Sequence, residues 1–178
     1  MTDSKRAVFF CSASFGIDPK YNQAAHEIVR AACMRGYDIV SGGATKGTMG
    51  VVCDTAAQCG AGNIGVLPRF MEEYLHPALT EIIWTDTMAE RKEAMRKGTS
   101  VAMALPGGIG TMDELFETFV LAKLHKYDGR VAAFNMDGYY DTLVKMLDEF
   151  VDRGMMEAAD RALITFPSTI EEAISIFE

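Results

Sequence analysis

The chain has 178 residues, and 17 Lys and Arg residues against 25 Asp and Glu residues give a formal net charge of −8. Hydrophobic residues make up 49% of it and charged residues 24%, which is ordinary for a globular domain. The negative balance disfavours nucleic acid and anionic membranes as partners, and no apolar run approaches the roughly 18 residues of a membrane helix. We therefore expect a single domain over residues 1–178.

The cysteines and histidines suggest neither a disulfide framework nor a metal centre. Cys11, Cys33, Cys53 and Cys59 are scattered without paired spacing, so we expect reduced thiols and a cytoplasmic protein. The histidines lie far apart in the sequence, and no H-E-x-x-H motif occurs. We expect no metal and no other cofactor.

Short apolar runs alternate with longer amphipathic segments along the chain. The first run, 7–11, predicts a buried strand, and Asp18 and Pro19 then predict the start of a helix. The other predicted strands are 37–40, 63–67, 79–84, 100–105, 131–134 and 162–165. The predicted helices are 19–35, 50–59, 85–97, 111–126, 139–153 and 168–177.

Strands that alternate with helices form parallel β-α-β units, and fully apolar strands are typical of a sheet covered on both faces. The sequence therefore predicts an α/β fold, a doubly wound parallel sheet of about seven strands with helices on both faces. Ligands of such sheets bind beyond the carboxyl ends of the strands. Two glycine-rich loops, 41–50 and 106–110, begin at such ends.

These loops are candidates for binding an anion. Glycine lets backbone N–H groups approach an anion closely, and the helix that follows adds free N–H groups and a favourable dipole. Neither loop is a Walker A motif or a G-x-G-x-x-G fingerprint. One such loop alone can be a tight strand-to-helix turn, but two at neighbouring strand ends favour one phosphate held between them.

Two charged residues fall near these loops in the predicted fold. The spacing from Thr111 to Glu114 is that of a capping box, which is the role that the pattern alone favours for Glu114. The same spacing occurs from Thr87 to Glu90 and from Ser168 to Glu171. Arg91 lies in the helix 85–97, whose first turns point at the same sheet edge, and Arg can bind phosphate through two hydrogen bonds. A solvent-exposed helix face is the alternative for Arg91.

The helix 111–126 is apolar around most of its circumference, which indicates burial on more than one side. Either other helices or a second subunit cover it, and we expect a homodimer.

Three sequence blocks, in order, make the chain resemble the LOG (Lonely Guy) family, some members of which are also labelled lysine decarboxylases. The family signature P-G-G-x-G-T-x-x-E is matched in full by 106–114. A Gly-Gly-Gly-x-x-G-x-M-G loop is matched at Gly42, Gly43, Gly47, Met49 and Gly50, and an M-x-x-R-K block at Met88, Arg91 and Lys92. Ala44 and Lys46 depart from the first loop's usual pattern.

The resemblance implies a Rossmann-like homodimer that cleaves a purine nucleoside 5′-monophosphate, of the cytokinin type or AMP, to free base and ribose 5-phosphate. Arg91 and Glu114 are then the residues required for catalysis. Substrate contacts are implied for the first-loop residues Gly42, Gly43, Gly47, Met49 and Gly50, for Glu73, Met88 and Lys92, and for Gly107, Gly108, Gly110 and Thr111 in the second loop. Glu73 is aligned through the neighbouring His76 and Pro77.

Two other functions compete with this interpretation. The same fold could carry a nucleotide or a phosphorylated cofactor without cleaving it, although a carrier would not need both Arg91 and Glu114. A lysine decarboxylase would need a Schiff-base Lys for pyridoxal phosphate, and the pattern singles out no such Lys.

Overall fold

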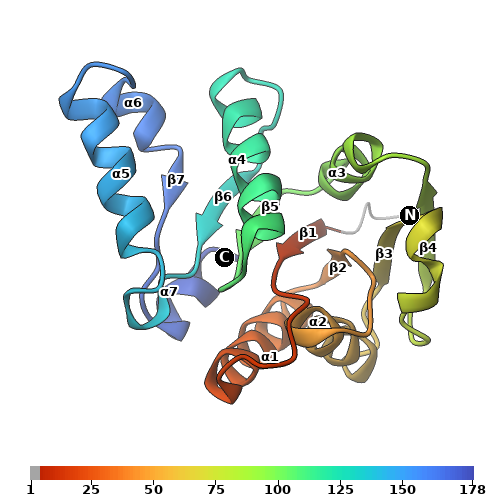
Figure 1. Cartoon of the computed structure of the whole chain (residues 1–178). Helices are drawn as coiled ribbons and strands as arrows, with labels where there is room; N and C mark the ends of the chain where they lie inside the picture. Colours follow the sequence, from red (N-terminus) through yellow and green to blue (C-terminus); the bar gives the residue numbers. More distant parts are fainter. Residues whose placement is uncertain (1–4) are drawn as a thin grey trace.

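A seven-stranded sheet forms the centre of the computed structural model, which describes residues 5–178; residues 1–4 of the predicted domain lie outside the described residues. All neighbouring strands are parallel, in the order β4-β3-β2-β1-β5-β6-β7 (Figure 1). The strands are β1 (Lys5–Phe10), β2 (Tyr37–Ser41), β3 (Asn63–Pro68), β4 (Glu81–Thr85), β5 (Val101–Ala104), β6 (Arg130–Ala133) and β7 (Ile164–Thr165). This confirms the predicted doubly wound α/β fold.

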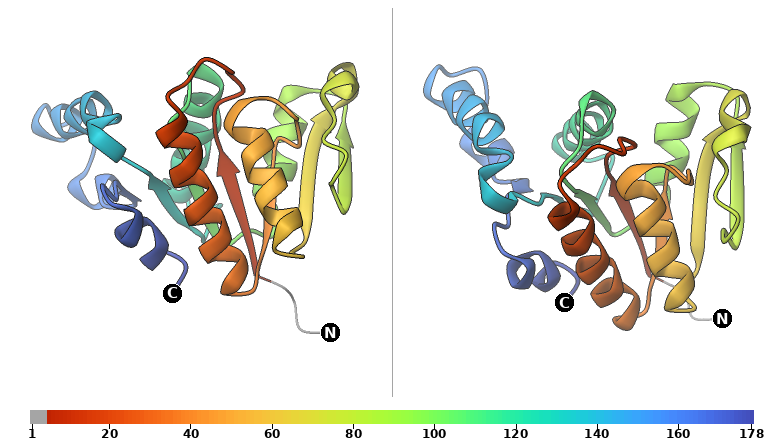
Figure 2. Two further views of the ribbon diagram at one scale, coloured as in Figure 1. Left: turned by 90° about the horizontal axis from the view of Figure 1, so that it is seen from below. Right: turned by 60° about the horizontal axis from the view of Figure 1, so that its bottom comes forward.

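Helices cover both faces of the sheet (Figure 2). The α-helices are α1 (Pro19–Met34), α2 (Gly47–Gln58), α3 (Met88–Arg96), α4 (Ile109–Lys123), α5 (Asp141–Asp152), α6 (Ala158–Arg161) and α7 (Ile170–Ser175), and short 3-10 helices occupy η1 (Arg69–Tyr74) and η2 (Met136–Gly138). Alternate residues of β1 divide between the two cores: Phe9 packs with α1, α2 and α7, and Phe10 packs with α3, α4 and α5. The period of two along a strand explains this division.

The strand order reverses at β1, which pairs with β2 on one side and β5 on the other. Such a reversal leaves a crevice beyond the carboxyl ends of the strands, because the following segments diverge to opposite sides. The first glycine-rich loop follows β2, and the second follows β5. The sheet therefore brings both loops to the same edge, one on each side of β1.

Local sequence signals set several helix starts correctly. The Asp18 carboxylate accepts the N–H of Lys20 at 3.0 Å, as expected of an N-cap before Pro19. Thr87 and Glu90 form a capping box at the start of α3.

Other predicted boundaries were wrong. The last helix begins one residue later than its Ser168 signal suggested, because Thr169 and Glu172 form its capping box. Helix α4 begins at Ile109 rather than at residue 111. The 3-10 helices and α6 were not predicted. Within residues 5–178, no helix has the length and apolar character needed to cross a membrane.

Candidate active site

A buried ion pair joins the two candidate catalytic residues. Arg91, in the first turn of α3, places Nη1 3.4 Å from Oε1 of Glu114 on α4. Its Nε donates to the carbonyl oxygen of Val66 at 3.0 Å, so the backbone of strand β3 also holds the guanidinium in place. Arg91 is 5% exposed and Glu114 is 7% exposed. A buried charge is stable only with a partner of opposite charge, and here Arg91 and Glu114 are partners for each other.

Burial changes the acid strength of Glu114. Desolvation raises the pKa of its carboxyl to about 7, although the Arg91 charge opposes that rise. The same two charges also act on the thiol of Cys11, which directly follows β1. Burial raises the pKa of this thiol, the negative charge of Glu114 raises it further, and the positive charge of Arg91 lowers it. A carboxyl with a pKa near 7 exchanges protons readily at neutral pH, which suits an acid or base in catalysis.

This placement corrects the role that the sequence pattern favoured for Glu114. Helix α4 begins at Ile109 with Gly108 as N-cap and no side-chain capping bond, so Thr111 and Glu114 form no capping box. The glycine-rich loop lets the chain turn into the helix earlier than a Thr cap would. Glu114 therefore lies one turn inside α4 and faces Arg91.

The first glycine-rich loop packs directly against this pair. A Cβ atom added to Gly42 would lie 2.2 Å from Nη2 of Arg91 and 2.7 Å from Sδ of Met49. Only a residue without a side chain lets the backbone come so near the guanidinium. Met49 itself is buried, and its sulfur accepts the N–H of Ala44 at 3.4 Å. Gly42, Met49, Arg91 and Glu114 thus form one contiguous cluster.

The rest of that loop serves mainly to hold its shape. Gly43 packs on the backbone of Gly65, while Gly47 lies against the segment after β1, near Ser12 and Ser14. The carbonyl oxygen of Ser12 accepts the N–H of Met49 at 3.2 Å. A Cβ on Gly50 would lie 2.6 Å from the Thr45 oxygen. These glycines allow close backbone packing, and the predicted ligand contacts of Gly43, Gly47 and Gly50 stay predictions.

The second glycine-rich loop leaves open space at the start of α4. A Cβ on Gly107 would lie 2.1 Å from Oγ1 of Thr111, so the loop folds tightly onto the first turn. A Cβ added to Gly108 or Gly110, by contrast, would have open space around it to a distance of 4 Å. The first-turn N–H groups of a helix lack partners within the helix, and here no side chain caps them. This combination suits an anion.

Three further predicted contact residues lie on α3 and η1. Lys92 binds Asp113 at 2.8 Å and Glu117 at 2.6 Å, so it connects α3 to α4, and its charge also opposes the rise in the Glu114 pKa. Met88 is exposed at the start of α3, and Glu73 is exposed on η1. Lys46, which departs from the family pattern, stacks its Nζ 3.2 Å from the centre of the Tyr74 ring. The substrate contacts of Lys92, Met88 and Glu73 stay predictions.

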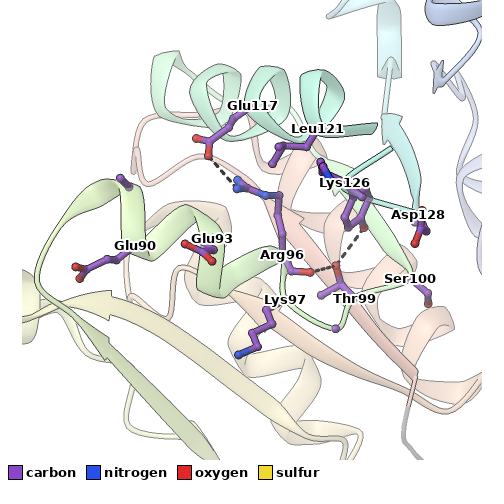
Figure 3. A pocket seen from close by; sticks show the side chains of 14 residues that line it. Glu90, Glu93, Arg96, Lys97, Thr99, Ser100, Glu117, Leu121, Lys126 and Asp128 are labelled. Carbon is purple, nitrogen blue, oxygen red and sulfur yellow. Dashed lines mark hydrogen bonds and ion pairs between the residues drawn. The ribbon is translucent and has the colours of Figure 1, made fainter. Parts of the chain in front are cut away.

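A cavity of about 880 Å³ lies between α3 and α4 (Figure 3). Nη2 of Arg96 binds Glu117 at 2.9 Å on its wall, while the Thr99 and Tyr127 hydroxyls lie 3.1 Å apart below. Neither Arg91 nor Glu114 lines it. Glu117 also binds Lys92, so one ion-pair network joins the wall of this cavity to the residue next to Arg91.

Sequence reasoning missed two residues at the site. Cys11 is buried where the charges of both Arg91 and Glu114 shift its pKa, but an apolar strand followed by Cys carries no sign of that. Tyr139, after β6, donates its hydroxyl hydrogen to the carbonyl oxygen of Gly107 at 2.7 Å. No pattern in the sequence assigned Tyr139 a contact. Within the described residues, no cluster of three or more metal-ligating side chains occurs.

Known proteins resemble this chain over nearly its whole length. A family model described as "Possible lysine decarboxylase" matches residues 49–177. The cytokinin riboside 5′-monophosphate phosphoribohydrolases LOG5 and LOG3 of Arabidopsis thaliana are each 32% identical to it. Both matches cover 98% of this chain, with 77% of LOG5 and 82% of LOG3.

The fold also resembles solved structures at lower sequence identity. The molybdenum cofactor carrier protein of Chlamydomonas reinhardtii superposes with a TM-score of 0.73 at 19% identity, covering 97% of this chain and 94% of that one. The molybdenum cofactor binding protein of Rippkaea orientalis gives 0.72 at 20%, with the same coverage. These two likenesses establish the fold, whereas the relatives above establish the family. The chain is a member of the LOG family, to which the lysine decarboxylase description has also been attached.

Proposed function

We propose that this protein hydrolyses the N-glycosidic bond of a purine nucleoside 5′-monophosphate, of the cytokinin type or AMP, to the free base and ribose 5-phosphate. The buried Arg91–Glu114 pair beside two glycine-rich loops carries this proposal. Burial raises the pKa of the Glu114 carboxyl to about 7, and carboxyls perturbed in this way cluster at catalytic sites. The relatives LOG5 and LOG3 bear the name of this activity.

The phosphate has a natural place at the start of α4. The uncapped N–H groups there and the open space around Gly108 and Gly110 suit a dianion. Arg91 is the cation of the cluster, and its Nη2 lies beside Gly42 in the first loop. A phosphate fixed in this way would hold the ribose at a set distance from Glu114, which is catalysis by positioning.

Glu114 would act on the sugar carbon. Cleavage of the bond between C1′ and the base nitrogen builds positive charge on the ribose, and a carboxylate stabilises such an oxocarbenium-like transition state. The bond between C1′ and the base nitrogen breaks as the water oxygen bonds to C1′. Glu114 takes one water proton, and that proton ends on the base nitrogen, directly or through solvent, which regenerates the carboxylate. At neutral pH, a carboxyl with a pKa of about 7 is available in both of the forms that this cycle needs.

We expect the working protein to be a cytoplasmic homodimer. Ile109 is 89% exposed, and Val120 and Leu124 are exposed on the same helix, α4. Apolar side chains in a row on one helix favour cover by a partner. The half-buried Met112 and Phe116 lie between them along the helix. We expect a second copy of the chain to cover this stripe, because in a two-fold dimer the same stripe of each copy would pack against the other.

A product assay separates this function from that of a carrier. Purified protein is incubated with AMP, with isopentenyladenosine 5′-monophosphate and with adenosine, and the free base and ribose 5-phosphate are quantified. We expect base release from the nucleotides and at least tenfold less from adenosine, which lacks the phosphate. The ratio of the two nucleotide rates identifies the preferred base. Tight nucleotide binding without release of base would replace the enzyme by a carrier.

A further inference from the structure

Two adjacent tyrosines that follow β6, Tyr139 and Tyr140, hydrogen-bond to the backbone of the second glycine-rich loop. The Tyr140 hydroxyl donates to the carbonyl oxygen of Leu105, and the Tyr139 hydroxyl donates to that of Gly107, both at 2.7 Å. The two carbonyls lie on either side of Pro106. The phenols thus hold the loop at two successive points.

The segment that carries the tyrosines is itself firmly held. The side-chain oxygen of Asn135 accepts the N–H of Tyr140 at 2.6 Å, and its amide nitrogen donates to Asp141 at 2.8 Å. The Tyr139 ring packs edge-on against Tyr140 and against Tyr21 of α1, with ring centres 4.9 and 5.7 Å apart. Tyr139 is therefore fixed in place although it is 43% exposed.

The bond to Gly107 has a directional consequence for the next residue. Within residues 5–178, all peptide bonds are trans, and in a planar trans peptide the C=O and the following N–H point in opposite directions. When Tyr139 fixes the Gly107 carbonyl, it also aims the Gly108 N–H away from itself. No acceptor within the described residues takes that N–H, and the space around Gly108 is open.

We propose that Tyr139 is a positioning residue that aims the Gly108 N–H at the substrate's phosphate. It touches the loop rather than the substrate, and its hydroxyl acts by fixing one peptide plane at the N-terminus of α4. Tyr140 has no such effect, because the peptide it fixes ends in Pro106, which has no N–H. The use of ribose 5-phosphate as the test ligand rests on the proposed function, whereas the hydrogen bond from Tyr139 to Gly107 is independent of it.

The test compares Tyr139→Phe with Tyr140→Phe, two variants that each lose one phenol hydroxyl. Ribose 5-phosphate and adenosine are titrated by calorimetry into wild type and both variants. For Tyr139→Phe, we expect ribose 5-phosphate to bind about three- to tenfold more weakly, the worth of one neutral hydrogen bond, with adenosine binding unchanged. If AMP is cleaved, KM for AMP should rise by the same factor with kcat close to wild type.

The control should behave differently. Tyr140 is buried, so Tyr140→Phe leaves the Leu105 carbonyl without its partner and should lower Tm while leaving ribose 5-phosphate affinity unchanged. Tyr139→Phe keeps an exposed ring and should keep the wild-type Tm.

Three results would overturn the inference: equal ribose 5-phosphate affinity in wild type and Tyr139→Phe, equal weakening of adenosine, or no ribose 5-phosphate binding by wild type. Binding of ribose 5-phosphate without cleavage of AMP contradicts only the proposed function, because the Tyr139 comparison still gives its answer.

Discussion

Replacing Glu114 by Gln should change how the protein's stability depends on pH. In the folded chain, the Glu114 pKa is about 7, against 4.5 for an ordinary glutamic acid. Between these values the native state binds more protons at this site than the unfolded state, so the free energy of unfolding falls as pH rises. Gln carries no proton to lose, so the variant lacks this contribution.

The size of the effect follows from the two pKa values. At pH 5 the carboxyl is already mostly ionised in the unfolded state but still protonated in the folded state, so a small part of the effect is present; at pH 8 the carboxyl is mostly ionised in both states, and nearly the full cost of ionising it in its buried position is present. With 1.36 kcal/mol for each pKa unit, the Glu114 contribution lowers the free energy of unfolding by about 2–3 kcal/mol between pH 5 and pH 8. Glu114→Gln should therefore gain about 2–3 kcal/mol relative to wild type over that interval.

Urea denaturation of both proteins at pH 5 and pH 8 measures this difference, because all other titrating groups cancel in the comparison. Glu117→Gln is a control of opposite sign. Its ion pairs with Lys92 and Arg96 outweigh partial burial and hold the Glu117 pKa below its usual range. That carboxylate stabilises the fold above its ordinary pKa of 4.5 and loses its effect only as pH falls below that value. The difference between Glu117→Gln and wild type should therefore stay nearly constant between pH 5 and pH 8 and shrink in a further measurement below pH 4.5. A difference between Glu114→Gln and wild type that does not vary with pH would refute the argument for a raised Glu114 pKa.

The other predictions concern the residues that support this carboxyl. Gly42→Ala places a Cβ 2.2 Å from Nη2 of Arg91, so the guanidinium must move. We expect kcat/KM for AMP to fall at least tenfold and the free energy of unfolding to fall by about 1–3 kcal/mol. The control Gly16→Ala, at an uncrowded position, should leave both quantities close to wild type. Arg91→Lys keeps the charge, but a lysine cannot bind both Val66 and Glu114 from one planar group. Steady-state kinetics should therefore give a kcat about 100-fold lower than that of wild type. A kcat near wild type would contradict the need for a guanidinium. Thr87→Ala removes the cap of α3, and urea denaturation should report a loss of about 1 kcal/mol; an unchanged midpoint would contradict the capping assignment.

Signals that act within a few residues were read correctly from the sequence. The Asp18 cap, the Thr87 capping box and the alternation of apolar strands with helices each depend on neighbouring residues. Their sum was enough to predict a parallel sheet covered on both faces, and both glycine-rich loops at its carboxyl edge.

The Thr111 prediction failed because two local signals compete at that helix. Ser, Thr, Asp or Asn usually marks a helix start, but Gly108 and the open loop allow α4 to begin earlier. A rule for caps, applied without the loop's geometry, therefore assigned Glu114 to the wrong role.

Contacts across the fold could not be read from spacing at all. The bond from Arg91 to Val66 joins residues 25 apart, and the bond from Tyr139 to Gly107 joins residues 32 apart. Lys92 and Arg91 are neighbours in sequence, yet only Arg91 faces Glu114, while Lys92 turns to Asp113 and Glu117. Which side of α3 faces α4 is set by tertiary packing.

In the function that we propose, Glu114 performs the chemistry while the loops and Arg91 bind the phosphate. The most direct test of these roles measures AMP binding by calorimetry and ribose 5-phosphate formation for wild type and Glu114→Gln at pH 7. We expect the variant to bind AMP within about tenfold of wild type and to form ribose 5-phosphate at least 100 times more slowly. A variant that releases base at nearly the wild-type rate would contradict it.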